Sequence, residues 1–202
     1  MARRSRPPPL PPELERARRR ALARLPEPPG PFFAIGELEG KTGIPLRTLI
    51  FWADRLVLRA TAASRAGRGT RRRFPFCELQ IAALLKPLSR GGLTIGVLGT
   101  FAAIFRSAID AYVSGRPPVD DAGQRMVNIG AVIARATAGI GKNWIVAGYT
   151  PPDILHVNPL TAEADERARL DLDTLLPEGF DRSETLILLL DLNLRLARLQ
   201  EA

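Results

Sequence analysis

The sequence predicts a mainly α-helical fold with a small β component. Apolar residues recur at helical spacing in five segments between residues 36 and 139. Short apolar runs bounded by glycine and proline predict a few strands in addition. A hydrophobic content of 46% and a charged content of 25% over 202 residues are typical of a soluble globular protein that can bury a core.

Composition excludes several functional classes. The chain has no run of about 18 apolar residues, so we expect no membrane span, and its N-terminus lacks the apolar region of a secretory signal. We therefore expect a cytoplasmic, nucleoid-associated protein. The single cysteine, Cys77, and the single histidine, His156, argue against a disulfide framework and a metal site. No nucleophile motif accompanies His156, so we expect no catalytic residues, no metal, no cofactor and no enzymatic activity.

Charge is distributed unevenly along the chain. Residues 1–119 contain 21 Lys and Arg against 8 Asp and Glu, whereas residues 120–202 contain 8 against 13. A basic front half and an acidic back half predict a polyanion-binding part and a part with another task. The alternative is a GC-rich genome, which would favour arginine over the chain's three lysines without any binding role.

The first 92 residues divide into two parts. Residues 1–31 are rich in proline and arginine and predict a mobile arm, which either lies along a DNA backbone or is a solvated tail. Residues 32–92 predict a compact head that begins with a short apolar segment, Phe32–Ile35. A helix follows over residues 36–42, with Leu38 on its buried face and Gly43 in a left-handed position after it.

A second helix begins at once after this turn. Pro45 suits its first turn, where a missing N–H does no harm. Leu46, Leu49 and Ile50 fall at positions i, i+3 and i+4 and predict its buried stripe, so Arg47 and Thr48 face outward. Two short helices joined by a glycine turn are the signature of a helix-turn-helix motif.

An arginine-rich hairpin is predicted next. Leu56–Leu58 and Arg72–Phe74 suit two short strands, and the loop between them contains Arg65 and Arg68. With the arginines at 71–73, five cations would line the rim of a wing that presses on phosphates. The alternative is a solvated loop without a partner, although like charges so close together repel one another.

Two longer helices complete the front half. The first spans about residues 77–89 and has a broad apolar face. The second spans about residues 95–114, with Thr94 as a candidate N-cap, within a connecting segment of residues 93–116. Its apolar positions cover more than one narrow seam, so we expect one side to pack on the head and another on a partner subunit, with purely intramolecular packing as the alternative.

Residues 117–202 predict a small α+β domain that oligomerises, senses a ligand or contacts another protein. A helix is expected over residues 122–139, and strands over 144–149 and 154–158 could form a hairpin. An apolar run predicts a buried strand over residues 184–190. The alternating pattern that follows permits either a longer strand or a helix capped by Asp191, and we prefer the helix.

The ordered motifs from about residue 34 to residue 106 resemble those of the MerR-type winged helix-turn-helix regulators. The residues that carry this resemblance are Ile35-Gly36-Glu37-Leu38, Thr42-Gly43-Ile44, Arg47-Thr48-Leu49, Phe51-Trp52, Leu56-Val57-Leu58, Gly69-Thr70-Arg71-Arg72-Arg73-Phe74 and Gly92-Leu93-Thr94. The resemblance implies a dimeric bacterial transcription regulator that binds double-stranded DNA. It also implies that the fourth helix mediates a homodimer.

Carried over by position, the resemblance assigns specific contacts. Arg47 and Thr48 would face the major groove, and Trp52 would reach a phosphate through its indole N–H. The full set of implied DNA-binding residues is Lys41, Arg47, Thr48, Trp52, Arg65, Arg68, Thr70, Arg71, Arg72 and Arg73. Ile50 and Phe51 depart from the family's usual Arg and Tyr, so we expect the wing to contribute more of the affinity.

Other readings of the same residues stay open. DNA-binding heads of this kind also occur in excisionase-like architectural proteins and in the small terminase subunits of phages. A further alternative is a protein-interaction adaptor whose head binds no DNA. Cys77, the only cysteine, is expected to be a small core residue rather than a redox or metal sensor.

Overall fold

The computed structural model describes residues 31–61, 72–115, 121–150, 153–162, 186–196 and 199. It is mainly helical with two small antiparallel sheets, which confirms the predicted fold class at that level. The helices are α2 (Ile35–Thr42), α3 (Leu46–Asp54), α4 (Phe76–Arg90), α5 (Ile95–Ser114), α6 (Asp121–Thr137) and the short α8 (Asn193–Leu196). The strands are β1 (Phe32–Ala34), β2 (Arg73–Pro75), β3 (Lys142–Thr150), β4 (Asp153–Ala162) and β5 (Leu186–Asp191).

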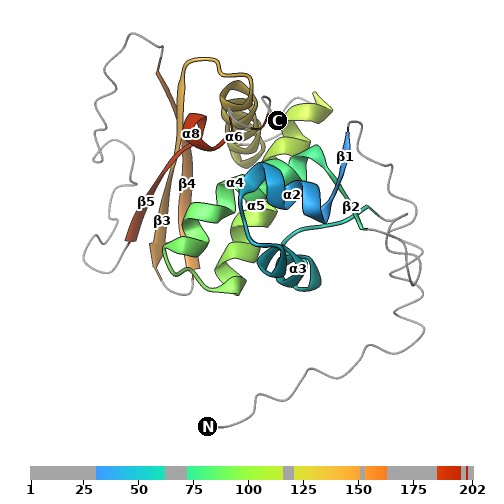
Figure 1. Cartoon of the computed structure of the whole chain (residues 1–202). Coiled ribbons are helices and arrows are strands. Elements are labelled where there is room, and N and C mark those ends of the chain that lie inside the picture. Colours follow the sequence, from blue (N-terminus) through green and yellow to red (C-terminus); the bar gives the residue numbers. More distant parts are fainter. Residues whose placement is uncertain are drawn as a thin grey trace, which may run out of the picture.

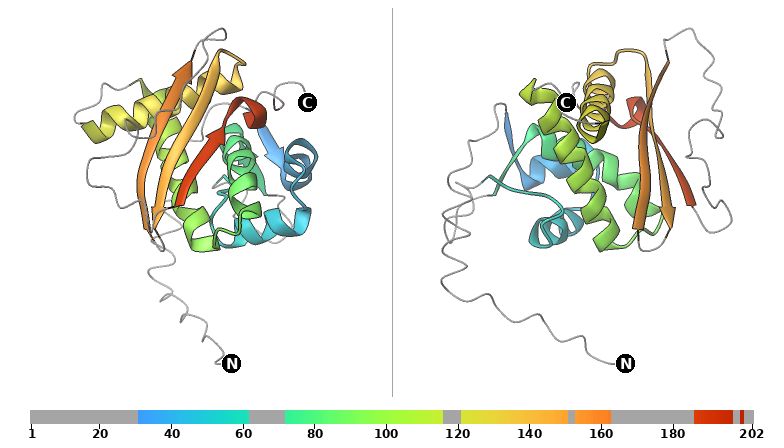
Figure 2. Two further views of the ribbon diagram at one scale, coloured as in Figure 1. Left: turned by 90° about the vertical axis from the view of Figure 1, so that its left-hand side faces the viewer. Right: turned by 180° about the vertical axis from the view of Figure 1, so that it is seen from behind.

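The elements form three layers (Figure 1). The sheet of β3, β4 and β5 forms one side of the molecule, and α2, α3 and the β1–β2 pair form the other. Helices α4, α5 and α6 lie between them, because α6 contacts β3 and β4 while α4 contacts α2, β1 and β2 (Figure 2). The middle layer therefore connects the basic front of the chain to its acidic back.

The small front sheet differs from the predicted hairpin. Strand β2 pairs antiparallel with β1, which precedes the helices, and Phe33 lies opposite Phe74. Residues 56–58, expected to be the partner strand, instead form a turn and a bend in which Leu56 has a φ of +61°. The reason is burial: the side chains of Val57 and Leu58 both pack into the core, which a flat strand would not allow.

The back sheet has the strand order β4-β3-β5, with β3 antiparallel to both neighbours. The predicted hairpin is confirmed as β3 and β4, and the predicted apolar strand is confirmed as β5. The helix preferred after β5 is confirmed over Asn193–Leu196, as the short α8, and residues 197, 198 and 200–202 lie outside the described part of the chain. The Asp191 carboxylate accepts a hydrogen bond from the Leu194 N–H at 3.1 Å. Asn193 ties this turn to the start of β3, since its Oδ1 accepts the Asn143 N–H at 2.7 Å.

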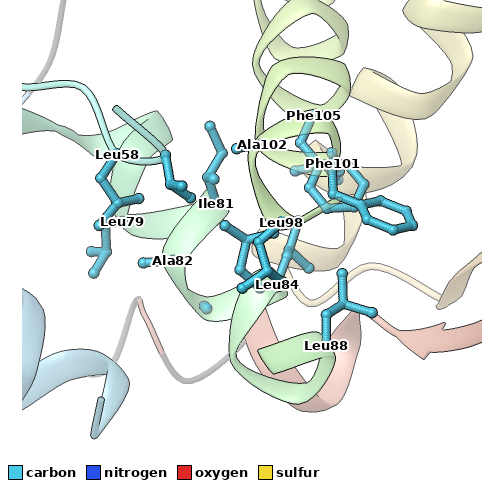
Figure 3. Packing of buried hydrophobic residues seen from close by; sticks show 14 of the residues in the cluster. Leu58, Leu79, Ile81, Ala82, Leu84, Leu88, Leu98, Phe101, Ala102 and Phe105 are labelled. Carbon is cyan, nitrogen blue, oxygen red and sulfur yellow. The ribbon is translucent and has the colours of Figure 1, made fainter. Parts of the chain in front are cut away.

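One hydrophobic cluster runs through all three layers. Its members extend along the chain from Leu38 in α2 to Leu199, and its centre is the packing of α4 against α5 (Figure 3). A buried hydrogen bond of 2.7 Å from Gln80 Nε2 to Thr137 Oγ1 adds a polar link between α4 and α6. The front and back of the chain thus share one core.

Helix α5 is packed on several sides within the chain. Its buried residues include Phe101, Phe105 and Ala108, and α6 crosses it closely at Gly130. Among the described residues, α5 is also the one helix that is long and apolar enough to cross a membrane by length and composition. About 33% of that apolar stretch is buried within the chain. Tyr112 and Val113, at its C-terminal end, are the large apolar residues that it leaves exposed.

Candidate nucleic-acid interface

The turn between α2 and α3 is held by side chains from α2 and α4. Gly43 adopts the predicted left-handed conformation, with a φ of +62°, and its N–H donates to the Glu39 carbonyl oxygen at 2.7 Å. Lys86 of α4 donates to the Thr42 carbonyl oxygen at 2.6 Å, which satisfies the C-terminal end of α2. The Glu39 carboxylate accepts the Leu46 N–H at 2.9 Å and so caps the start of α3. The angle between the two helices is therefore fixed by polar contacts as well as by packing.

The rotation of α3 differs from the sequence prediction. Its buried residues are Leu49, Trp52 and Ala53, at i, i+3 and i+4, and of the predicted stripe only Leu49 is buried. Leu46 and Ile50 are exposed instead. The sequence contains two overlapping apolar stripes in this helix, and the larger area of Trp52 favours the second one.

Burial also changes the role of Trp52. Its side chain is 2% exposed and belongs to the core cluster, so the structure offers its indole N–H no open surface for a phosphate. This corrects the contact expected from the resemblance. The neighbouring Phe51 takes the outward position, and the Arg55 guanidinium lies 5.4 Å from the centre of its ring.

The outward face of α3 therefore combines charged and apolar side chains. Arg47 is exposed at the second position of the helix and Thr48 is half-buried beside it. Ile50 and Phe51 follow one turn later, and Asp54 ends the face. The two residues expected to face a groove, Arg47 and Thr48, are thus on or next to the exposed side.

The described residues that flank the arginine-rich segment, Thr61 before it and Arg72 after it, lie beside the end of α3. The Thr61 N–H donates to the Arg73 carbonyl oxygen at 2.8 Å, so the two ends of the segment lie next to each other. The Arg72 guanidinium pairs with the Asp54 carboxylate at the end of α3, with 2.7 Å between Nη1 and Oδ1. Of the predicted contact residues, Arg65, Arg68, Thr70 and Arg71 lie outside the described residues.

Lys41 lies apart from this group. It is half-buried in the last turn of α2, and its ammonium nitrogen is 5.8 Å from the centre of the Phe33 ring. The structure therefore places Arg47 and Thr48 on α3 and Arg72 against the end of that helix, whereas Arg73 lies opposite Ala34 of β1 and Lys41 lies beside Phe33 of the same strand.

A buried ion pair anchors the segment that follows α3. The Glu78 carboxylate of α4 receives two hydrogen bonds from Arg106 of α5, at 2.6 Å from Nε and 2.9 Å from Nη2. Glu78 also accepts the Arg59 N–H at 2.9 Å, and Arg106 donates to the Val57 carbonyl oxygen at 3.0 Å. Burial, and then the nearby Arg106 charge, lower the pKa of the Arg59 guanidinium. No local sequence pattern predicts this pair, because its members lie 28 residues apart.

Cys77, one residue before Glu78, is a poor candidate for chemistry. Burial, followed by the charges of Glu78 and Asp110, raises the pKa of its thiol to about 12. A thiol with so high a pKa is a weak nucleophile at neutral pH, which agrees with the expected small core residue. Within the described part of the chain, no group of three or more His, Cys, Asp and Glu residues could hold a metal ion.

Comparison with known proteins adds no assignment. No protein-family model matches this sequence, and no curated protein matches it either.

Proposed function

We propose that this chain is a DNA-binding transcription regulator of the MerR-like type, which binds duplex DNA as a dimer through a winged helix-turn-helix head. In this proposal α2 and α3 form the helix-turn-helix, and the arginine-rich segment between Thr61 and Arg72 forms the wing. The proposal also places the protein in the cytoplasm, associated with the nucleoid. The acidic back half would oligomerise or sense a ligand or protein.

The contact between Asp54 and Arg72 is the observation that best supports this proposal. It joins the end of α3 to Arg72, the first described residue after the arginine-rich segment, so a cation of that segment lies against the exposed face of the helix. Residues 32–92 contain eleven Lys and Arg against four Asp and Glu, a net charge of +7. Cations gathered beside an exposed helix are the electrostatic footprint of a DNA-binding surface.

A salt series tests the proposal directly. Binding of randomised duplex DNA would be measured by fluorescence anisotropy for the wild type, for Arg47→Ala combined with Arg72→Ala, and for Arg125→Ala. Arg125 is the matched control, because it is exposed on α6 in the back half. We expect the double variant to bind about tenfold or more weakly and the slope of log affinity against log salt to fall by about two, one for each lost phosphate contact.

A second variant tests the same surface in the opposite direction. Asp54→Asn removes a carboxylate from the DNA face and frees Arg72, so we expect tighter binding and a steeper salt dependence. Equal binding by the wild type, the double variant and Asp54→Asn would contradict the proposed face. Absence of any duplex binding at low salt would contradict DNA binding as a whole.

The exposed apolar residues of α3 favour one competing function. Ile50 and Phe51 are 42% and 45% exposed, and apolar side chains on an open helix face are common in protein-interaction modules. In that case residues 32–92 would form a protein-binding adaptor domain rather than a DNA-binding domain. The salt series distinguishes the two functions, since an adaptor would show no binding to duplex DNA.

A further inference from the structure

The outward ridge of α3 has an unusual composition for a helix that faces a polyanion. Arg47, Ile50, Phe51 and Asp54 are spaced at i, i+3, i+4 and i+7, so they share one face. Both middle residues are apolar and more than 40% exposed. Phe51 stacks with Arg55, which leaves Ile50 as the aliphatic side chain in the middle of the ridge.

The position of Ile50 is fixed by the rest of the helix. Leu49 and Trp52 are buried on the opposite side, and the Glu39 carboxylate holds the Leu46 N–H at the first turn. The helix therefore cannot rotate to bury Ile50 without exposing Trp52. An isoleucine in a helix also has one strongly preferred χ1 rotamer, so a partner would meet an already ordered side chain.

The charges around Ile50 favour DNA over an apolar protein surface as the partner. Arg47 lies one turn before it, and Asp54, one turn after it, holds Arg72. Seven residues of helix separate Arg47 from Asp54, about 10 Å along the axis, so a cation lies near each end of the ridge. With the ridge in the major groove of B-DNA, these cations would meet backbone phosphates while Ile50 faces the base edges.

We infer that Ile50 reads the C5-methyl group of a thymine in the major groove. This inference rests on the proposed DNA-binding function and specifies what the head recognises. An isoleucine side chain has no hydrogen-bond donor or acceptor, so it cannot pair with the amino, carbonyl and ring-nitrogen groups of the base edges. The thymine methyl is the one apolar group that a standard base pair presents in this groove.

The inference predicts a preference for one or more thymines at fixed positions in the bound duplex. Removing one methyl group from an apolar contact weakens binding by about fourfold. Deoxyuridine differs from thymidine only by that methyl, and its hydrogen-bonding pattern is unchanged. Exchange of a single thymine for uracil is therefore a specific probe.

The experiment uses the full chain. Duplexes would be selected from a library with a randomised 20-base-pair centre, and the best binder would be resynthesised with each thymine replaced in turn by deoxyuridine. Binding would be measured for the wild type, Ile50→Ala and Ile140→Ala. Ile140 is the matched control, since it is an exposed isoleucine in the turn after α6, in the back half of the chain.

For the wild type and Ile140→Ala, we expect replacement of a thymine by uracil at one or two positions to weaken binding about fourfold. For Ile50→Ala, we expect the uracil and thymine duplexes to bind equally. Thermal unfolding would check that Ile50→Ala is folded, as expected for a side chain with 42% exposure. Equal binding of thymine and uracil duplexes at every position would overturn the inference and leave the proposed function standing. A uracil effect that survives in Ile50→Ala would assign the methyl contact to another residue and overturn it as well. Absence of binding to any duplex at low salt would overturn both.

Discussion

Replacing Arg106 by methionine is expected to destabilise the fold strongly, because it leaves the Glu78 carboxylate buried without its partner. The side chains of Glu78 and Arg106 are 2% and 11% exposed, and two hydrogen bonds of 2.6 and 2.9 Å join them. Arg106 also satisfies the Val57 carbonyl oxygen at 3.0 Å, which the variant would leave unpaired. In the variant, the Glu78 carboxylate would keep only its hydrogen bond from the backbone N–H of Arg59.

The expected size follows from the cost of an uncompensated buried charge. Breaking a buried ion pair from one side costs about 3–5 kcal/mol of unfolding free energy. In a protein of this length, each kcal/mol lowers the unfolding temperature by about 2–4 °C. We therefore expect Arg106→Met to lower that temperature by about 6–20 °C.

The double variant Glu78→Leu with Arg106→Met should be more stable than Arg106→Met alone. An apolar pair of similar volume leaves no buried charge and is often close to neutral. Urea unfolding followed by circular dichroism would give both free energies, and Arg125→Met, at an exposed position of α6, is the control. A loss below about 1 kcal/mol for Arg106→Met, or a double variant less stable than the single one, would refute the reasoning.

Three further predictions concern other parts of the fold. An added Cβ at Gly130 would lie 2.2 Å from the Ala108 carbonyl oxygen, so Gly130→Ala should cost about 2 kcal/mol or more by thermal unfolding, whereas Gly40→Ala, with nothing within 4 Å, should be neutral or stabilising. Leu56 is exposed with a φ of +61°, so Leu56→Gly should raise the unfolding free energy by about 0.5–1 kcal/mol, and a loss would argue against strain at this residue. The pKa of Cys77 is raised to about 12 in the fold, so the unfolded chain loses this proton first and stability should fall as pH rises from about 9 to 12. Urea unfolding at a series of pH values should show a shallower fall for Cys77→Ala than for the wild type.

Sequence patterns predicted the regular elements well where one signal dominated. The predicted fourth helix has the observed bounds of α5, because Thr94 before it and Gly115 after it mark its ends. Gly43 marked the turn before α3 because a left-handed residue is needed there. The hairpin of β3 and β4 was predicted from the turn at residues 150–153, which interrupts two runs of strand-forming residues.

The errors arose where tertiary packing chose between local alternatives. In α3 two apolar stripes overlap by one residue, and only the contacts of Trp52 with the core select the buried one. Residues 56–58 have strand propensity, but burial of Val57 and Leu58 and the Arg106 contact bend this segment instead. The charge pair of Glu78 and Arg106 could not be predicted, since nothing in either local segment indicates the other.

The single core has a consequence for how the molecule opens. Because α4 and α5 contribute most of the central packing, and α4 contacts the front elements while α5 contacts α6 and β4, their amide protons should exchange with solvent only when the whole chain unfolds. Helices α2 and α3 are attached to this centre through Lys86 and the buried face of α3, so their exchange rates depend on the same global equilibrium. A molecule that binds the back sheet and stabilises the fold would therefore slow exchange at α3 without touching it. Hydrogen exchange at the outward helix is thus a readout for any ligand of the acidic half.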